Sequence, residues 1–318
     1  MERKFKRRSF INRISLGISA LVAKPIVSAA TFLQDESPNT IMNQPKESII
    51  RIQAMGFQWE TADPFLFCVH HEDKFPKGNA IMGPVDSLAG RHLGDDFIIK
   101  DGYRMYHGKR VPGFPGHPHR GFETVTVVRE GIVDHADSLG AAGRYGNGDV
   151  QWMTAGGGVQ HSEMFPLIHE DKENPMELFQ IWLNLPAKNK MVKPHFKMLW
   201  GDTIPKYKPN ENVVVEVIAG KLENHVAPAP PPDSWASDPS NEVMILNIKM
   251  QAGETWTLPA ASTGINRTLY FYEGTQLHIN GTSIPGYHAV TVEPDMNLVL
   301  ENGADACSIL VLQGKPIN

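Results

Sequence analysis

Short runs of apolar residues recur along this chain, either continuous or alternating with polar residues, and most end at Gly, Pro, Asn or Asp. Such runs with turn residues between them are typical of β-strands rather than helices. Several short strands of this kind indicate an all-β sandwich or barrel. We predict strands over residues 48–53, 65–69, 124–128, 132–135, 149–153, 177–185, 243–250, 255–259, 268–272, 276–279, 289–292, 297–300 and 308–312.

Two stretches interrupt this pattern. Residues 72–116 are rich in Gly, Pro, Asp and His with few periodic runs, so we expect long loops around a barrel mouth. Residues 227–234 read APAPPPDS, a stiff segment typical of a boundary between domains. We therefore predict a first β-domain at 50–226, a Pro-rich linker at 227–241 and a second β-domain at 242–318. His70, His71, His92 and His107 have no partner at ligand spacing, and we expect them to be surface or structural residues.

Candidate metal ligands concentrate between residues 116 and 166. His117 and His119 form one pair with alternate spacing, and His161 and Glu163 form a second. In a strand, alternate side chains point to the same face, so each pair can aim both members at a single point. If the two strands face one another inside a barrel, three imidazoles and one carboxylate converge. This set suits a divalent first-row metal and leaves open positions on it, so we predict a mononuclear metal site.

The two halves of the chain share a local pattern. TVTVVREG, which begins at Thr124, resembles TLYFYEG, which begins at Thr268. At an offset of 144 residues, the positions of His117 and His119 are occupied by Ala and Thr in the second half, and residues 295–301 contain no His. His278 and His288 stand alone. We therefore predict two related barrels, the first with a metal and the second without.

Charge and cysteine content exclude several classes of protein. Residues 1–30 carry seven of the 30 basic residues and one of the 35 acidic residues, so the remainder has a net charge of −11. An acidic body argues against a nucleic-acid-binding surface. Cys68 and Cys307 each lie in an apolar run and form no Cys-x-x-Cys pair, which excludes zinc-ribbon and thioredoxin-like chemistry.

Residues 1–30 have the pattern of a targeting peptide. A basic segment containing Arg7-Arg8-Ser9-Phe10-Ile11 precedes an uncharged run at 14–23 and then small residues. The paired arginines resemble a twin-arginine signal, and the uncharged run is too short to span a membrane. We predict a signal peptide at 1–30, a polar linker at 31–49 and a periplasmic or secreted protein. The location would be cytoplasmic if the segment is not a signal.

Several motifs together resemble the pirin family, within the cupin superfamily. They are HPHRGFET at 117–124, QWMTAG at 151–156 followed by His161-x-Glu163, DPFL at 63–66, LNLP at 183–186 and LQGKP at 312–316. The resemblance covers residues 50–316 and implies a bicupin fold. It also implies iron (Fe2+/Fe3+) held by His117, His119, His161 and Glu163, although nickel, copper and manganese accept overlapping ligands. Family members commonly continue into a C-terminal tail or helix beyond the last strand, so a chain ending at Asn318 is expected to have a more open inter-barrel face.

Two carboxylates compete for the fourth ligand position. Glu123 has the same parity as His119, but a straight strand would place it about 13 Å away unless the chain bends at Gly121. Glu163 needs no bend, and the pirin pattern also selects it. We favour Glu163 as the ligand and expect Glu123 to orient one of the imidazoles.

The resemblance also implies an activity, quercetin 2,3-dioxygenase. The expected partners are then O₂ and a small aromatic substrate, a flavonol or a related phenolic, with Glu163 or Glu123 available to take its proton. Phe122, Trp152 and Met153 are candidate pocket walls or core residues. The alternative is a metal-dependent binding or redox-sensing protein without turnover.

Overall fold

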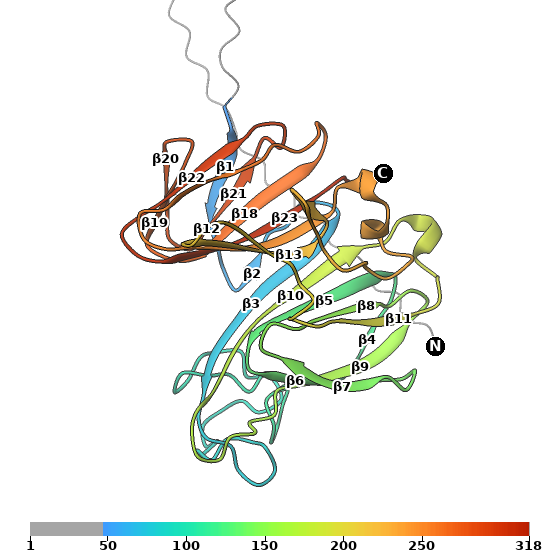
Figure 1. The fold of residues 1–318 in the computed structure, drawn as a ribbon. Helices are drawn as coiled ribbons and strands as arrows, with labels where there is room; N and C mark the ends of the chain where they lie inside the picture. The colour runs from blue at the N-terminus through green and yellow to red at the C-terminus, as the bar shows by residue number, and fades with distance from the viewer. Residues whose placement is uncertain (1–46, 318) are drawn as a thin grey trace, which may run out of the picture. The chain divides into compact units, whose positions relative to one another are not determined.

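The computed structural model describes residues 47–317, and the chain over this range is built almost entirely of antiparallel strands (Figure 1). The all-β class predicted from the sequence is confirmed. Its helices are the three short 3-10 turns η1 (Ala187–Asn189), η2 (Trp235–Ser237) and η3 (Pro239–Asn241), and no helix in residues 47–317 has the length and apolar character to cross a bilayer. The predicted signal peptide and residues 31–46 of the predicted linker lie outside the described residues.

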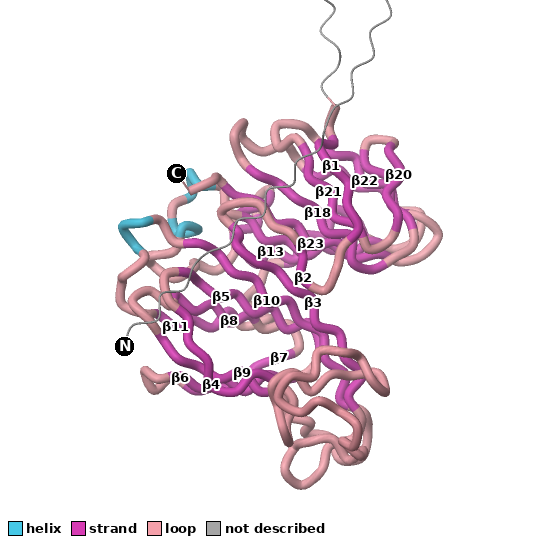
Figure 2. Tube along the Cα trace, turned by 180° about the vertical axis from the view of Figure 1, so that it is seen from behind, coloured by secondary structure: helices cyan, strands magenta, loops and turns pink. Residues whose placement is uncertain are grey.

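The first barrel combines a six-stranded and a four-stranded sheet. The six-stranded sheet has the order β11-β8-β5-β10-β3-β2, and the four-stranded sheet has the order β4-β9-β6-β7. The loop-rich stretch between β3 and β4 gathers at one end of this barrel (Figure 2). The strands are β2 (Gln58–Trp59), β3 (Phe65–Phe75), β4 (Gly113–His119), β5 (Phe122–Glu130), β6 (Ile132–Asp137), β7 (Ala142–Gly146), β8 (Val150–Thr154), β9 (Val159–Met164), β10 (Asn174–Asn184) and β11 (His195–Leu199).

The second barrel repeats this arrangement with a seven-stranded sheet, β1-β21-β18-β23-β16-β13-β12, and a four-stranded sheet, β17-β22-β19-β20. A two-stranded hairpin, β14-β15, precedes the Pro-rich segment. The strands are β1 (Ile49–Ala54), β12 (Lys206–Asn210), β13 (Val213–Ala219), β14 (Lys221–Leu222), β15 (His225–Val226), β16 (Met244–Met250), β17 (Thr255–Leu258), β18 (Asn266–Glu273), β19 (Gln276–Ile279), β20 (Thr282–Pro285), β21 (His288–Val292), β22 (Leu298–Asn302) and β23 (Cys307–Gly314).

The seven-stranded sheet takes strands from both sides of the Pro-rich segment. β12 and β13 precede residue 227 in the sequence, yet β13 pairs with β16, with Val215 opposite Ile248. β1 pairs with β21 from the other end of the chain. The buried side chains of β13 enter the apolar core of the second barrel, which explains this placement. The sheet therefore does not follow the sequence boundary predicted at 226/227.

The two large sheets pack against each other through a shared apolar core. Val125 of β5 and Phe179 of β10 contribute to it from the first barrel, and Ile245 of β16 and Leu310 of β23 contribute from the second. Because successive strand residues face opposite sides, the intervening residues of β5 and β10 point into the first barrel. This alternation makes one face of the six-stranded sheet structural and leaves the other for a site.

The register of the internal repeat differs by one residue from the predicted offset of 144. At that offset Val125 would correspond to Leu269, but Val125 lies in the shared core and Leu269 lies inside the second barrel. A slip of one residue moves every side chain to the other face of a strand. Both motifs end in a Glu-Gly pair, which begins at residue 130 in the first and at residue 273 in the second, so the offset is 143. At this offset, residues that face the barrel interior in one half correspond to residues that face the interior in the other. Thr124 then corresponds to Arg267.

Candidate metal centre

Three histidines meet inside the first barrel. One ring nitrogen from each of His117, His119 and His161 lies within 4.8 Å of the others. His117 and His119 come from β4, and His161 comes from β9, where it stands directly opposite His117 in the ladder. The predicted convergence therefore arises from neighbouring strands of one sheet, whose paired side chains are close, and not from strands that face each other across the barrel.

The hydrogen bonds of the three rings are suited to holding a cation. His117 Nδ1 lies 2.9 Å from the Pro115 carbonyl oxygen and must donate to it. In the neutral ring, Nε2 is then unprotonated and has a lone pair that can bind a metal. His161 Nε2 lies 3.0 Å from His117 Nε2, and the buried His119 Nε2 has no hydrogen-bond partner among the described residues. Two nitrogens bound at right angles to one metal, each about 2.1 Å away, are about 3.0 Å apart. The residues present therefore fit a metal.

Burial keeps two of the rings, those of His119 and His161, neutral. Burial, together with the neighbouring imidazoles, lowers the pKa of His161 to about 3 and that of His119 to about 4. The Glu163 carboxylate raises the pKa of His119, but by less than burial lowers it. Since a metal binds the neutral imidazole, these two rings are in their ligand form at neutral pH.

The Glu163 carboxylate lies beside the three rings. Its Oε2 is 3.7 Å from His161 Nε2. Gln180 Nε2 donates to Oε2 at 2.9 Å, and Thr126 Oγ1 shares its hydrogen between Glu163 Oε1, 2.9 Å away, and Gln180 Oε1, 2.7 Å away. These two donors, from β5 and β10, fix the carboxylate at the inner wall of the barrel. Direct ligation by Glu163 stays a prediction.

Glu123 is not part of this cluster, and the role predicted for it in orienting an imidazole is wrong. Its carboxylate accepts hydrogen bonds from Thr154 Oγ1 at 2.6 Å and from Ser234 Oγ at 2.5 Å. It is fully buried on the face of β5 that carries Val125. The expected bend at Gly121 exists, with φ of 79°, but there the chain leaves one sheet and enters another. The parity counted from His119 therefore does not carry over to Glu123.

His135 contacts the ring nitrogen of His161 that faces away from the other two histidines, and this contact was not predicted. Its Nδ1 lies 3.4 Å from His161 Nδ1, and its Nε2 lies 3.2 Å from Asp137 Oδ2. Both residues lie on β6, which pairs with β9 so that Asp137 stands opposite His161. The available signal was a third alternate-spaced pair of ligand type, His135-x-Asp137. Such contacts fix which ring nitrogen faces the metal.

An aromatic pocket of about 470 Å³ opens onto the histidines. His117, His119 and Glu163 line it together with Phe122, which was predicted as a wall. Trp152 instead belongs to the shared apolar core, as its alternative role predicted. The aromatic walls are Phe57, Phe67, Phe97, Phe114, Phe122, Phe165 and Trp182.

His71 also lines this pocket, although it was expected to be a surface or structural residue. Its Nδ1 lies 2.8 Å from the hydroxyl of Tyr106, and that hydroxyl donates to Asp73. His71 Nδ1 must therefore donate to Tyr106, which leaves Nε2 as a hydrogen-bond acceptor. Burial, with the charge of Arg104, lowers the pKa of His71 to about 3, so the ring is neutral.

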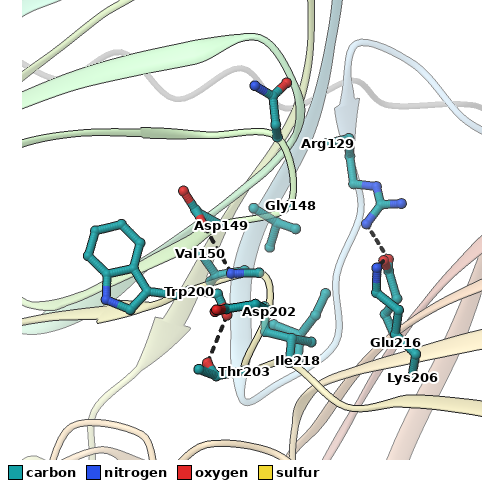
Figure 3. A pocket seen from close by; sticks show the side chains of 14 residues that line it. Arg129, Gly148, Asp149, Val150, Trp200, Asp202, Thr203, Lys206, Glu216 and Ile218 are labelled. Carbon is teal, nitrogen blue, oxygen red and sulfur yellow. Dashed lines mark hydrogen bonds and ion pairs between the residues drawn. The ribbon is translucent and has the colours of Figure 1, made fainter.

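A second pocket of about 660 Å³ lies between the barrels on the other face of β5. Figure 3 shows Arg129 pointing to Glu216, with which it forms an ion pair between the two barrels. Trp200 stands at the rim, half exposed. The charges here are largely paired within the protein, and the described residues place no metal-ligand cluster there. The aromatic pocket of the first barrel is the stronger candidate for chemistry.

Comparison with known proteins identifies the family of this chain. The pirin family profile matches residues 52–183. A Pseudomonas aeruginosa protein named as a candidate quercetin 2,3-dioxygenase is 37% identical over 228 residues, which cover 70% of this chain and 76% of that protein.

Two solved structures show the same fold. Quercetin 2,3-dioxygenase from Acinetobacter baumannii superposes with a TM-score of 0.65 at 24% identity, covering 85% of each chain. The bacterial pirin YhhW from Escherichia coli, in complex with nickel(II), gives 0.50 at 17% identity, covering 84% of this chain and 96% of its own. The fold and the histidine cluster define a protein of the cupin class with two barrels. Within that class, the chain belongs to the pirin family.

Proposed function

We propose that this pirin is a metal-dependent dioxygenase, with iron as the metal, that acts on a flavonol or a related phenol. The observation that carries the proposal is an aromatic pocket lined by two members, His117 and His119, of a cluster of three histidines. The name of the Pseudomonas aeruginosa relative supports the same reaction. The metal, when bound, supplies a site for O₂ and for a phenolate oxygen.

The walls of the pocket suit a flat aromatic substrate. Phe122 and Trp182 lie with ring centroids 4.6 Å apart, and Trp182 also contacts the ring of His119 at 5.5 Å. Aromatic rings packed in this way bind another ring through stacked or edge-to-face contacts and exclude water. A flavonol packed against these rings inside the pocket would have its polar edge next to His117 and His119.

The protein's own groups can take up and place a proton. His117, His119, His161 and Glu163 would hold the metal, and Glu163 is the carboxylate that lines the pocket among the described residues, placed to accept the proton of a phenol hydroxyl. Thr126 and Gln180 prevent that carboxylate from turning away. His71 offers a neutral acceptor for a second phenol hydroxyl, because Tyr106 fixes its tautomer.

The test is anaerobic loading of the full chain with Fe2+, followed by measurement of O₂ uptake with quercetin. His119→Ala is the inactive variant, and His278→Ala, in the second barrel, is the matched control. Turnover that is lost in the first and kept in the second would support the proposal. Bound metal without uptake by any phenol tested would overturn the dioxygenase reaction and favour a metal-dependent binding or redox-sensing role. No bound metal would overturn the site itself.

We also propose that residues 1–30 direct export by the twin-arginine route, which carries folded proteins and so allows metal loading before export. Fractionation of cells that express the full chain tests this proposal. Replacement of Arg7 and Arg8 by Lys should retain the protein in the cytoplasm, and equal export of both forms would contradict it.

A further inference from the structure

The second barrel has a pocket of its own, of about 590 Å³. The Pro-rich segment and the turn after it form one wall, at residues 226–230 and 236–239. Leu258 of β17, Arg267 of β18 and Gln313 of β23 form the inner wall. We call this the linker pocket. It lies at the end of the second barrel where β18 begins, and its lining is mostly aliphatic.

Arg267 is a buried cation in this pocket. Its side chain faces the inside of the barrel with Leu269, and the residue is only 2% exposed. Nε donates to Gln313 Oε1 at 2.7 Å, and Nη1 donates to the Pro259 carbonyl oxygen at 2.8 Å. Both acceptors are neutral. In the part of the chain that the structure describes, Arg267 forms no ion pair, and Nη2 has no hydrogen-bond partner.

A buried guanidinium without a carboxylate is energetically unfavourable. Burial lowers the pKa of Arg267 to about 10, and the charge of Glu242 offsets only part of this effect. Buried charges are normally paired, because desolvation costs several kcal/mol per ion. A purely structural residue that ties the Pro259 carbonyl to Gln313 would not need a charge. The cation therefore indicates an anion that is not supplied by residues 47–317.

Three acidic residues line the pocket, Glu223, Asp238 and Glu242, and none forms an ion pair with Arg267. Glu242 Oε2 accepts from the Ser262 backbone N–H at 3.2 Å. Asp238 Oδ1 accepts from the Ser240 backbone N–H at 2.9 Å and from its hydroxyl at 2.7 Å. These carboxylates leave the guanidinium free for a ligand. Their negative charge near the pocket also disfavours a ligand with two negative charges, such as a phosphate monoester.

We propose that the linker pocket binds a small monocarboxylate with an apolar body. Its carboxylate pairs with Arg267, through Nη2, in the planar geometry that guanidinium groups favour. Its apolar body packs against Leu258, Ala261 and the Pro-rich wall. The site is separate from the histidine cluster and does not depend on the dioxygenase proposal.

Benzoate is the probe, titrated into metal-free full-length protein by calorimetry and by NMR. Benzamide has the same shape without the charge, and phenyl phosphate carries a second charge. We expect benzoate to bind and the other two to bind at least about tenfold more weakly. Binding of all three with equal affinity would overturn the charge requirement.

Two substitutions locate the binding site. Arg267→Met removes the charge and should weaken benzoate binding by about tenfold to hundredfold. Ala261→Phe fills the pocket and leaves Arg267 in place, so it should also abolish binding and remains informative if Arg267→Met does not fold. His119→Ala should bind benzoate like the wild type. Unchanged affinity in Ala261→Phe, loss in His119→Ala, or no binding to the wild type would each overturn the proposal.

Discussion

The two barrels have the same architecture but opposite interiors. In the first, inward positions of β5, β9 and β10 carry Thr126, Glu163 and Gln180, and these polar side chains bond to each other around the histidines. In the second, the corresponding interior is filled by residues such as Leu269 and Leu300. One backbone can therefore enclose either a reactive cavity or a packed core. The difference lies in the residues at alternate strand positions.

This contrast has an energetic side. Every polar group inside the first barrel needs a partner, and His119 Nε2 lacks one among the described residues. Apart from Arg267 and Gln313 at one end, the second barrel buries mainly apolar side chains, which stabilise it without such requirements. The shared apolar core contains residues of both barrels. Burial in this core and in the second barrel can therefore stabilise a first barrel whose interior is polar.

The largest expected difference between the barrels is in metal binding. His161→Ala removes the central ring of the cluster and should weaken metal affinity by more than about hundredfold. His278→Ala removes a ring from the second barrel and should leave affinity unchanged. Elemental analysis and competition with a chelator measure both. If His161→Ala retains its metal at full affinity, the site is not the histidine cluster.

Loss of His135 should have a smaller effect. His135→Ala removes the group that holds His161 from behind, so metal affinity should fall by about tenfold to hundredfold. Asp137→Asn, one step further from the ring, should have a weaker effect. Isothermal titration with Ni2+ measures the series, and circular dichroism checks the fold. Equal affinity in His135→Ala and the wild type would limit His135 to a packing role.

Glu123 lies at the junction of the first barrel with Ser234 of the Pro-rich segment, and it should make stability depend on pH. Burial raises its pKa to about 7. The folded protein therefore favours the protonated form, and the associated stability is full below the ordinary pKa of a Glu, about 4.3, and is lost as pH rises through 7. Glu123→Gln is neutral throughout and should be more stable than the wild type at pH 8, by roughly 3 to 4 kcal/mol.

Thermal denaturation between pH 4 and pH 8 measures this effect. The wild type should lose stability relative to Glu123→Gln as pH rises. Glu130→Gln removes an exposed carboxylate from the same strand and serves as the control. Parallel profiles for the wild type and Glu123→Gln would show that Glu123 does not titrate in this range.

The smallest expected effect is that of the ion pair between the barrels. Arg129 on β5 pairs with Glu216 on β13, and Asn247 Nδ2 also donates to Glu216 at 3.1 Å. Because Glu216 retains that donor, Arg129→Met should reduce the free energy of unfolding by about 1 kcal/mol. A double-mutant cycle with Glu216→Gln, measured in urea, isolates the pair. A coupling energy of zero would mean that the shared apolar core alone holds the barrels together.

Local pattern was sufficient to predict most strands and the histidine pairs. Strands such as β8 and β16 have the apolar runs that the sequence indicated, and His117, His119 and His161 do converge. The strands and the facing within each pair depend only on the local pattern, whereas the convergence of the two pairs also required that β4 pair with β9. The same rule failed for Glu123, since alternation restarts where the chain passes from one sheet to another at Gly121.

Other features depend on contacts between distant segments. His135 faces His161 only because β6 pairs with β9, and β13 joins the second barrel only because it pairs with β16. No local signal specifies such pairings. The role of Arg267 was also not predicted. At the offset of 144 residues, Arg267 corresponds to Glu123, which faces the shared apolar core, whereas Arg267 faces the inside of its barrel.

The first strand of the described chain has a consequence for how the protein can be divided. Ile52 of β1 pairs with Val290 of β21, so the second barrel is complete only after nearly all of the chain has been synthesised. A fragment that starts at the Pro-rich segment would lack β1, β12 and β13 and would expose the backbone of β16 and β21. Unpaired edges of this kind promote aggregation. The two barrels are therefore not interchangeable modules, and recombination within this family is expected to exchange them together.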